Sequence, residues 1–182
     1  MFVVDLKCIV MNRLELVRNE IDVILLNQTN VEQRPLGYIH LYGVSQNCVI
    51  LALKRGLNVE LCAIIGILHD FHTYKFGYVK EHAALGAVEV ENILRDLEIF
   101  SEKEVEIIKT AINNHSDKEN KHDKYSELIK DADVLQNSIY SSEFEIKHKK
   151  RLKKVFKDLG IKVKLKNGIL AKKNFEFLSK ES

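Results

Sequence analysis

The near lack of helix-breaking residues is the feature that most constrains how this chain can fold. Among 182 residues there is a single proline, Pro35, and only eight glycines. Proline and glycine are the residues that most disfavour a helix interior, so almost the whole chain is free to be helical. Apolar residues also recur at three- and four-residue spacing, which is typical of amphipathic helices. We therefore predict an all-α fold built as a helical bundle.

Six segments in the first 140 residues carry this helical spacing. They span residues 6–26, 44–55, 59–69, 82–97, 101–115 and 125–140. Asn58 is a suitable N-cap for the third segment, and Ser101 with Glu104 matches a capping box before the fifth. The third segment is apolar on nearly every side, so we expect it to form the buried centre of the bundle.

The segments between these helices are expected to be loops. Residues 27–34 are interpreted as a polar segment that leads through Pro35 and Gly37 to His40, where the second helix is expected to begin. Residues 71–80 are aromatic and polar, and we expect them to cross the mouth of a site, while 116–124 form another polar loop. On the sixth helix, Ile139 is expected on the side facing the core.

The C-terminal part of the chain differs from the rest in charge. Residues 1–146 carry 15 basic and 23 acidic side chains, whereas 147–182 carry 13 basic and three acidic ones. We expect a basic helix over 143–158, then a β-hairpin, because alternating apolar residues precede Asn167-Gly168. Residues 147–182 are predicted to be a solvated basic appendage. Nucleic-acid binding is the alternative, but no stacking aromatic residues are interleaved with the lysines.

Composition excludes several other classes of protein. Apolar residues make up 46% of the chain and charged residues 30%, as in a folded soluble protein. No apolar run approaches the ~20 residues of a membrane span, and residues 1–11 lack the features of a secretion signal. The three cysteines, Cys8, Cys48 and Cys62, are dispersed without C-x-x-C spacing. We expect reduced cysteines in the core of a cytoplasmic protein.

The adjacent pair His69-Asp70 is unusual because it ends a wholly apolar helix. A buried imidazole and a buried carboxylate both need partners, and a first-row divalent metal ion would satisfy both. A helical bundle could supply further ligands from other helices. The candidates are His40, His82, His115, Asp131 and Asp133. Helical spacing alone does not decide between the two aspartates.

The order His40, His69-Asp70, Asp133 resembles the H…HD…D pattern of the HD superfamily of metal-dependent phosphohydrolases. The match covers about residues 38–140. The segments HLYGVSQNCVILA, GILHDFHTYKFG, EHAALGA, INNHSDK and IKDADVL are also similar to those of small bacterial HD proteins. The resemblance implies an HD-type helical domain over residues 1–146, followed by the basic appendage at 147–182. It also selects Asp133 over Asp131 as a ligand.

The resemblance further implies the chemistry. His40, His69, Asp70 and Asp133 would hold one divalent ion, while His82 and His115 would hold a second one bridged by Asp70. The resemblance does not select among Mn, Fe, Co, Ni, Mg and Zn. Metal-bound hydroxide would attack a phosphate ester or anhydride, with a nucleotide as the expected substrate and Asp70 as the catalytic residue that orients the water. The alternative is a regulatory HD module that binds metal and nucleotide without turnover.

Two lysines and three further histidines are not expected to bind metal. Lys75 and Lys118 flank the expected site and are candidates for contacts with the substrate phosphate, although ordinary surface lysines are an equal alternative. The other histidines, His72, His122 and His148, are expected to be solvated, and His72 is also a candidate for lining the pocket.

Overall fold

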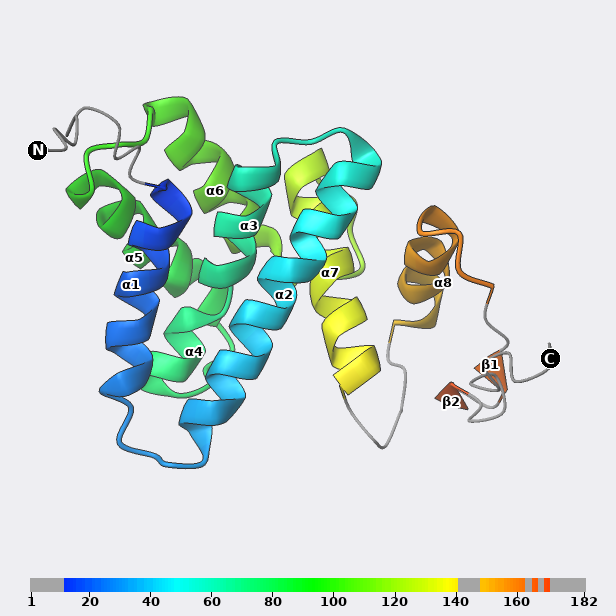
Figure 1. Ribbon diagram of the computed structural model, residues 1–182, viewed down its shortest axis with the longest axis horizontal. Coiled ribbons are helices and arrows are strands. Elements are labelled where there is room, and N and C mark those ends of the chain that lie inside the picture. Colours follow the sequence, from blue (N-terminus) through cyan, green and yellow to red (C-terminus); the bar gives the residue numbers. More distant parts are fainter. Residues whose placement is uncertain (1–11, 141–147, 163–164, 167–168, 171–182) are drawn as a thin grey trace, which may run out of the picture.

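A computed structural model describes residues 12–140, 148–162, 165–166 and 169–170. These residues form eight helices and one pair of two-residue strands (Figure 1). The elements are α1 Arg13–Leu26, α2 Gln33–Arg55, α3 Val59–Leu68, α4 Phe71–Phe76, α5 His82–Asp96, α6 Glu102–Asn114, α7 Lys124–Tyr140, α8 Lys149–Asp158, β1 Leu165–Lys166 and β2 Ile169–Leu170. The predicted all-α class is confirmed.

Helix α3 is the buried centre of the bundle, as its sequence predicted. Every residue from Leu61 to Leu68 is buried, and the Asn58 side chain caps the helix by accepting a hydrogen bond from the Leu61 amide. The backbones of α3 and α2 come very close at Gly66, where an added Cβ would lie 2.6 Å from the Cα of Ser45. This close contact fixes the end of α3, where His69 and Asp70 follow.

The start of α2 differs from the prediction. The helix begins at Gln33 rather than at residue 44, and Pro35 lies in its first turn. Proline is tolerated there because the amides of the first turn have no partner within the helix. His40 therefore lies two turns inside α2 instead of at its beginning.

Two further expectations were wrong. Residues 71–80 are not wholly a loop, because Phe71–Phe76 form the short helix α4, whose Phe71 is completely buried. Glycine permits the positive φ of 94° at Gly77, where α4 ends. Ile139 does not face the core, since 53% of its surface is exposed. The capping box of Ser101 and Glu104 at the start of α6 is present as predicted.

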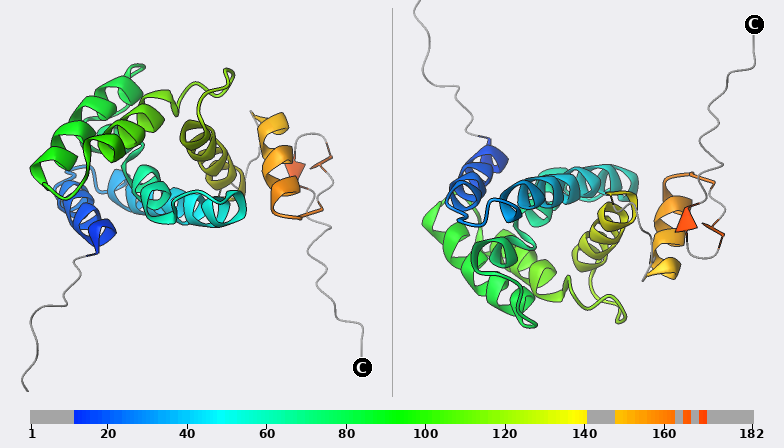
Figure 2. Two further views of the ribbon diagram at one scale, coloured as in Figure 1. Left: turned by 90° about the horizontal axis from the view of Figure 1, so that it is seen from above. Right: turned by 90° about the horizontal axis from the view of Figure 1, so that it is seen from below.

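Helix α8 packs against α7, as both views in Figure 2 show. Its apolar stripe of Leu152, Val155 and Phe156 is buried in the same core cluster as α2, α3 and α7. Beyond it, β1 and β2 pair in antiparallel fashion, so the predicted hairpin is confirmed. Several predictions concern residues outside the described ranges: Cys8, the first helical turn before residue 12, residues 143–147 of the basic helix, and Asn167-Gly168.

By length and composition, α2 is apolar enough to cross a membrane. Core helices of soluble proteins meet the same criterion. In this fold, α2 contributes Leu41, Val44, Cys48 and Leu51 to the core and packs against α3 and α7.

Candidate metal centre

Six of the predicted site residues come together although they lie on six different elements or helix ends. His40 is inside α2, His69 ends α3 and Asp70 precedes α4. The remaining three are His82 at the first position of α5, His115 directly after α6, and Asp133 in α7. The bundle therefore gathers four imidazoles and two carboxylates that span more than 90 residues of sequence.

One group of donors consists of His40, His69 and Asp133. The two Nε2 atoms of His40 and His69 are 3.1 Å apart. Oδ1 of Asp133 lies 3.5 Å from Nε2 of His40 and 3.9 Å from Nε2 of His69. These three side chains could hold one metal ion. Bonds of about 2.1 Å to a shared first-row ion would place its ligand atoms roughly 3–3.5 Å apart, which is close to this spacing.

A second group of donors surrounds Oδ1 of Asp70. This oxygen lies 3.1 Å from Nε2 of His115 and 3.3 Å from Nε2 of His82, and those two nitrogens are 3.3 Å apart. The other oxygen of Asp70, Oδ2, faces the first group at 3.5 Å from His69 and 3.6 Å from His40. Asp70 thus presents one oxygen to each group of histidines.

Backbone carbonyls set the orientation of three imidazoles. Nδ1 of His69 contacts the carbonyl oxygen of Gly66 at 2.8 Å, Nδ1 of His82 that of Val79 at 2.9 Å, and Nδ1 of His115 that of Ile112 at 2.6 Å. A carbonyl only accepts, so each Nδ1 must carry the proton, and in a neutral imidazole Nε2 is then an unprotonated acceptor. A carbonyl partner of this kind also orients histidines that ligate metals.

This orientation leaves the second group with three acceptors and no donor. Nε2 of His82, Nε2 of His115 and Oδ1 of Asp70 lie within 3.3 Å of one another. Three lone pairs at this distance repel unless a proton or a metal ion lies between them. The donor set therefore fits a divalent cation by both its geometry and its chemistry.

The pKa values of His69, Asp70 and Asp133 favour the protonation states that a metal requires, whereas burial lowers the pKa of His40 but the carboxylates of Asp70 and Asp133 raise it overall. Burial lowers the pKa of His69 to about 3, so this imidazole is neutral. Burial raises the pKa of Asp70, but the surrounding imidazoles of His69, His115 and His40 more than offset this and hold it well below its usual range. Likewise burial raises the pKa of Asp133, yet the positive charge of Lys118 and the nearby histidines lower it overall. Neutral imidazoles and ionised carboxylates are the forms that bind metal.

The structure shows which of the candidates Asp131 and Asp133, and which of Lys75 and Lys118, lies at the centre. Asp131 points away from the histidines and pairs with Arg55 and Arg151, both at 2.7 Å, whereas Asp133 faces them. Nζ of Lys118 lies 2.6 Å from Oδ2 of Asp133. Lys75 is not brought to the centre, because it pairs with Glu89 at 3.0 Å on the exposed side of α4.

Residues that sequence reasoning missed also surround the centre. Asn137 donates a hydrogen bond of 2.8 Å to Oδ1 of Asp133, and its i+4 spacing on α7 was the available signal. The ring of Tyr74 lies 6.1 Å from that of His40. His72 was expected to be solvated, but it is 7% exposed and its Nδ1 lies 2.7 Å from Glu89, because it is on α4 and not in a loop.

The fold and the site together indicate an all-α protein in which histidines and aspartates from most of the helices form a candidate metal centre. Comparison with known protein families matches the HD domain over residues 37–138, more than half of the chain. The chain therefore belongs to the HD domain family. No curated protein and no solved structure matches it significantly. HD domains bind divalent metals and are typically hydrolytic. In this structure, two groups of side chains could hold such ions: His40, His69 and Asp133, and His69, Asp70 and His115.

Proposed function

We propose that this protein is a phosphohydrolase that holds two divalent ions and cleaves a phosphate ester or anhydride of a nucleotide. The observation that carries the proposal is the position of Asp70, whose two oxygens face separate histidine groups. In the proposed site, His40, His69, Asp70 and Asp133 hold the first ion, and Asp70, His82 and His115 hold the second. We also propose a cytoplasmic location, which the buried free thiols Cys48 and Cys62 support.

In the proposed mechanism, the chain's own residues hold the site in place and balance the negative charge of the substrate. When bound, divalent ions activate water for attack on phosphorus and neutralise the charge of phosphoryl oxygens. Asp70 is suited to orient that water, because its side chain remains 21% exposed while the surrounding histidines are more deeply buried. Lys118 adds a positive charge beside Asp133, where the anionic substrate would be received.

A nucleotide is favoured over a simpler phosphate ester by the aromatic side chains next to the centre. Tyr78 is 73% exposed, and its ring lies 5.2 Å from the ring of His82. Phe76, two residues earlier, is 62% exposed. An exposed aromatic face beside a phosphate site offers a surface on which a nucleobase can stack.

The proposal is tested by phosphate release from the full chain loaded in turn with Mn²⁺, Co²⁺, Ni²⁺, Mg²⁺, Zn²⁺ or Fe²⁺. The substrates are nucleoside mono-, di- and triphosphates, dinucleoside polyphosphates and cyclic nucleotides, with a phosphomonoester lacking a base for comparison. We expect metal-dependent turnover that favours nucleotides and is abolished by Asp70→Ala. Asp96→Ala, which removes an exposed carboxylate from the end of α5, is the matched control.

The outcome separates the enzyme from the regulatory alternative. Metal-dependent nucleotide binding without hydrolysis under any of these metals would support a regulatory module instead. Equal turnover in Asp70→Ala and in wild type would contradict the assignment of this site.

A further inference from the structure

A second cleft lies outside the metal centre, and none of the six proposed ligands lines it. It encloses about 740 Å³ between the end of α2, the segment 119–122 and the helices α7 and α8. This volume is within the range of sites that bind small molecules, roughly 300–1,000 Å³. The cleft is therefore large enough for a phosphorylated metabolite.

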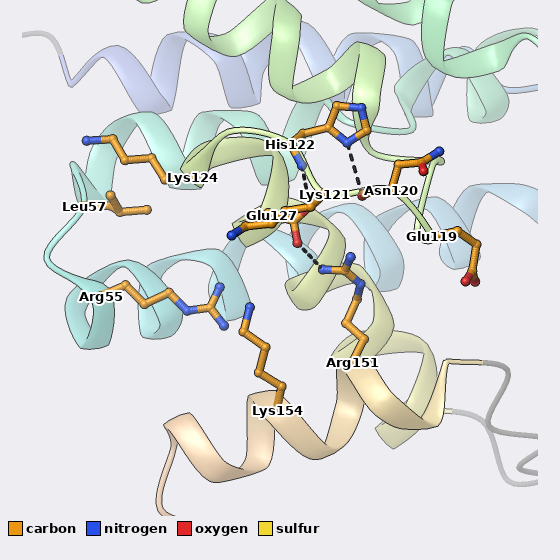
Figure 3. A pocket seen from close by; sticks show the side chains of 10 residues that line it. All are labelled: Arg55, Leu57, Glu119, Asn120, Lys121, His122, Lys124, Glu127, Arg151 and Lys154. Atoms are coloured by element: carbon orange, nitrogen blue, oxygen red, sulfur yellow. Dashed lines mark hydrogen bonds and ion pairs between the residues drawn. The ribbon is translucent and has the colours of Figure 1, made fainter.

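Positive side chains dominate the lining of this cleft. Five cations line it, namely Arg55, Lys121, Lys124, Arg151 and Lys154, against two carboxylates, Glu119 and Glu127. Figure 3 shows the charged ends of Arg55, Arg151 and Lys154 turned toward the same space between α2, α7 and α8. Arg55 is on α2, whereas Arg151 and Lys154 are on α8, so the packing of two helices distant in sequence creates the positive cluster.

A single buried carboxylate holds the three cations together. Asp131 is fully buried and lies 2.7 Å from Arg55, 2.7 Å from Arg151 and 3.4 Å from Lys154. Asp158 and Glu127 provide one further partner each, to Arg55 and to Arg151. The side chain of Lys154 nevertheless remains 54% exposed. The ion pairs thus orient the two largely buried arginines and leave the ammonium group of Lys154 exposed to the cleft.

Two lysines at the rim add charge that these acids do not balance. Within the described part of the chain, neither Lys121 nor Lys124 has a salt-bridge partner, and both side chains are exposed. Several cations held at fixed positions around a concave space are the arrangement that binds a multiply charged phosphate group.

We propose that this cleft is a second ligand site, which binds the polyphosphate group of a small molecule. Its cations are spread over three helices and a loop, so they can contact several phosphates of one chain and not only a single phosphate. Among the lining residues there is no Phe, Tyr or Trp on which successive bases of a nucleic acid could stack, which favours a small molecule over single-stranded RNA. The site is independent of the function proposed for the metal centre.

The test is calorimetric titration of the full chain with sodium tripolyphosphate in EDTA, so that no metal ion contributes to binding. Lys121→Ala/Lys154→Ala removes one charge at the rim and one inside the cleft, while Asp131 keeps both of its arginine partners. We expect this double variant to lower the affinity by about tenfold or more, as for the loss of charge-assisted hydrogen bonds. Lys103→Ala/Lys153→Ala removes two exposed lysines that do not line the cleft, and should bind as wild type does.

Three results would overturn the proposal. Equal affinities of the two double variants would show that tripolyphosphate binding depends only on the overall charge of the protein. Loss of binding in Lys118→Met would place the anion at the metal centre. Tighter binding of a single-stranded RNA 20-mer, weakened by Lys153→Ala/Lys157→Ala, which removes two exposed lysines of α8 outside the cleft, would identify the basic surface of α8 as a nucleic-acid site.

Discussion

The ammonium group of Lys118 lies 2.6 Å from Oδ2 of Asp133, the carboxylate that completes the first histidine group. The other oxygen of Asp133 accepts a hydrogen bond from Asn137. The backbone of Lys118 is also held, because its carbonyl accepts a hydrogen bond of 3.0 Å from Arg151 on α8. The loop after α6 is thereby fixed between the metal centre and the C-terminal helix.

We predict that Lys118→Met keeps the metal content of the protein but slows hydrolysis by about 10- to 100-fold, because it removes a preorganised positive charge next to the substrate phosphate. Metal analysis and phosphate release from the best nucleotide provide the two measurements. Lys75→Met is the matched control, since Lys75 pairs with Glu89 away from the centre and should retain full turnover. An equal loss in both variants would contradict the role given to Lys118.

The number of metal ions depends on His82 and His115. We predict two equivalents of divalent metal per chain in wild type and one in the His82→Ala/His115→Ala variant, with most turnover lost. The remaining ion is expected because His40, His69 and Asp133 are unchanged. Elemental mass spectrometry after gel filtration measures the stoichiometry, and circular dichroism monitors the fold. His122→Ala/His148→Ala should keep both ions, and unchanged stoichiometry in the first variant would remove the bridging role of Asp70.

Helix α8 should contribute strongly to stability. Leu152 is completely buried in the shared core, so Leu152→Ala is expected to lower the free energy of unfolding by about 2–5 kcal/mol. Lys153→Ala, which changes the adjacent exposed residue, should change it by no more than about 0.5 kcal/mol. Urea unfolding monitored by circular dichroism measures both variants. A stability of Leu152→Ala equal to that of wild type would mean that α8 does not belong to the folding unit.

The ion pairs of Glu127 should make stability depend on pH. Burial raises the pKa of Glu127, but the hydrogen bonds from the His122 amide, Arg151 and Lys130 lower it overall to about 2 from its ordinary value of 4.5. The unfolded chain therefore takes up this proton first as the pH falls. The stabilisation is complete above pH 4.5 and is lost progressively between 4.5 and 2.

Glu127→Gln should consequently be less stable than wild type at pH 7, and the difference should shrink as the pH falls below 4.5. We expect a difference on the order of 1 kcal/mol at pH 7, because solvent screens this partly exposed group. Urea unfolding in EDTA at several pH values is the measurement, with the exposed Glu20→Gln as a control. A difference that stays constant with pH would show that hydrogen bonding rather than ionisation stabilises the contact.

Local signals in the sequence were sufficient to predict most of the helices. Asn58 and the pair Ser101 and Glu104 cap their helices as predicted, because capping depends only on residues a few positions apart. The early start of α2 was missed because Pro35 was interpreted as part of a loop, although a proline is compatible with the first turn of a helix. Ile139 was placed in the core by its periodicity, but among the described residues its side chain is left 53% exposed near the end of α7.

The sequence by itself determined the helical class, the central helix α3 and the ordered set of histidines and aspartates that resembles the HD pattern. Only the tertiary structure decided which candidates meet. Asp131 and Asp133 are two residues apart on α7 and so point in widely different directions, and both are buried. Asp133 faces His40 and His69, whereas Asp131 faces the cations of α2 and α8. Periodicity cannot separate them, because it records which residues are buried and not which neighbouring helix each one contacts.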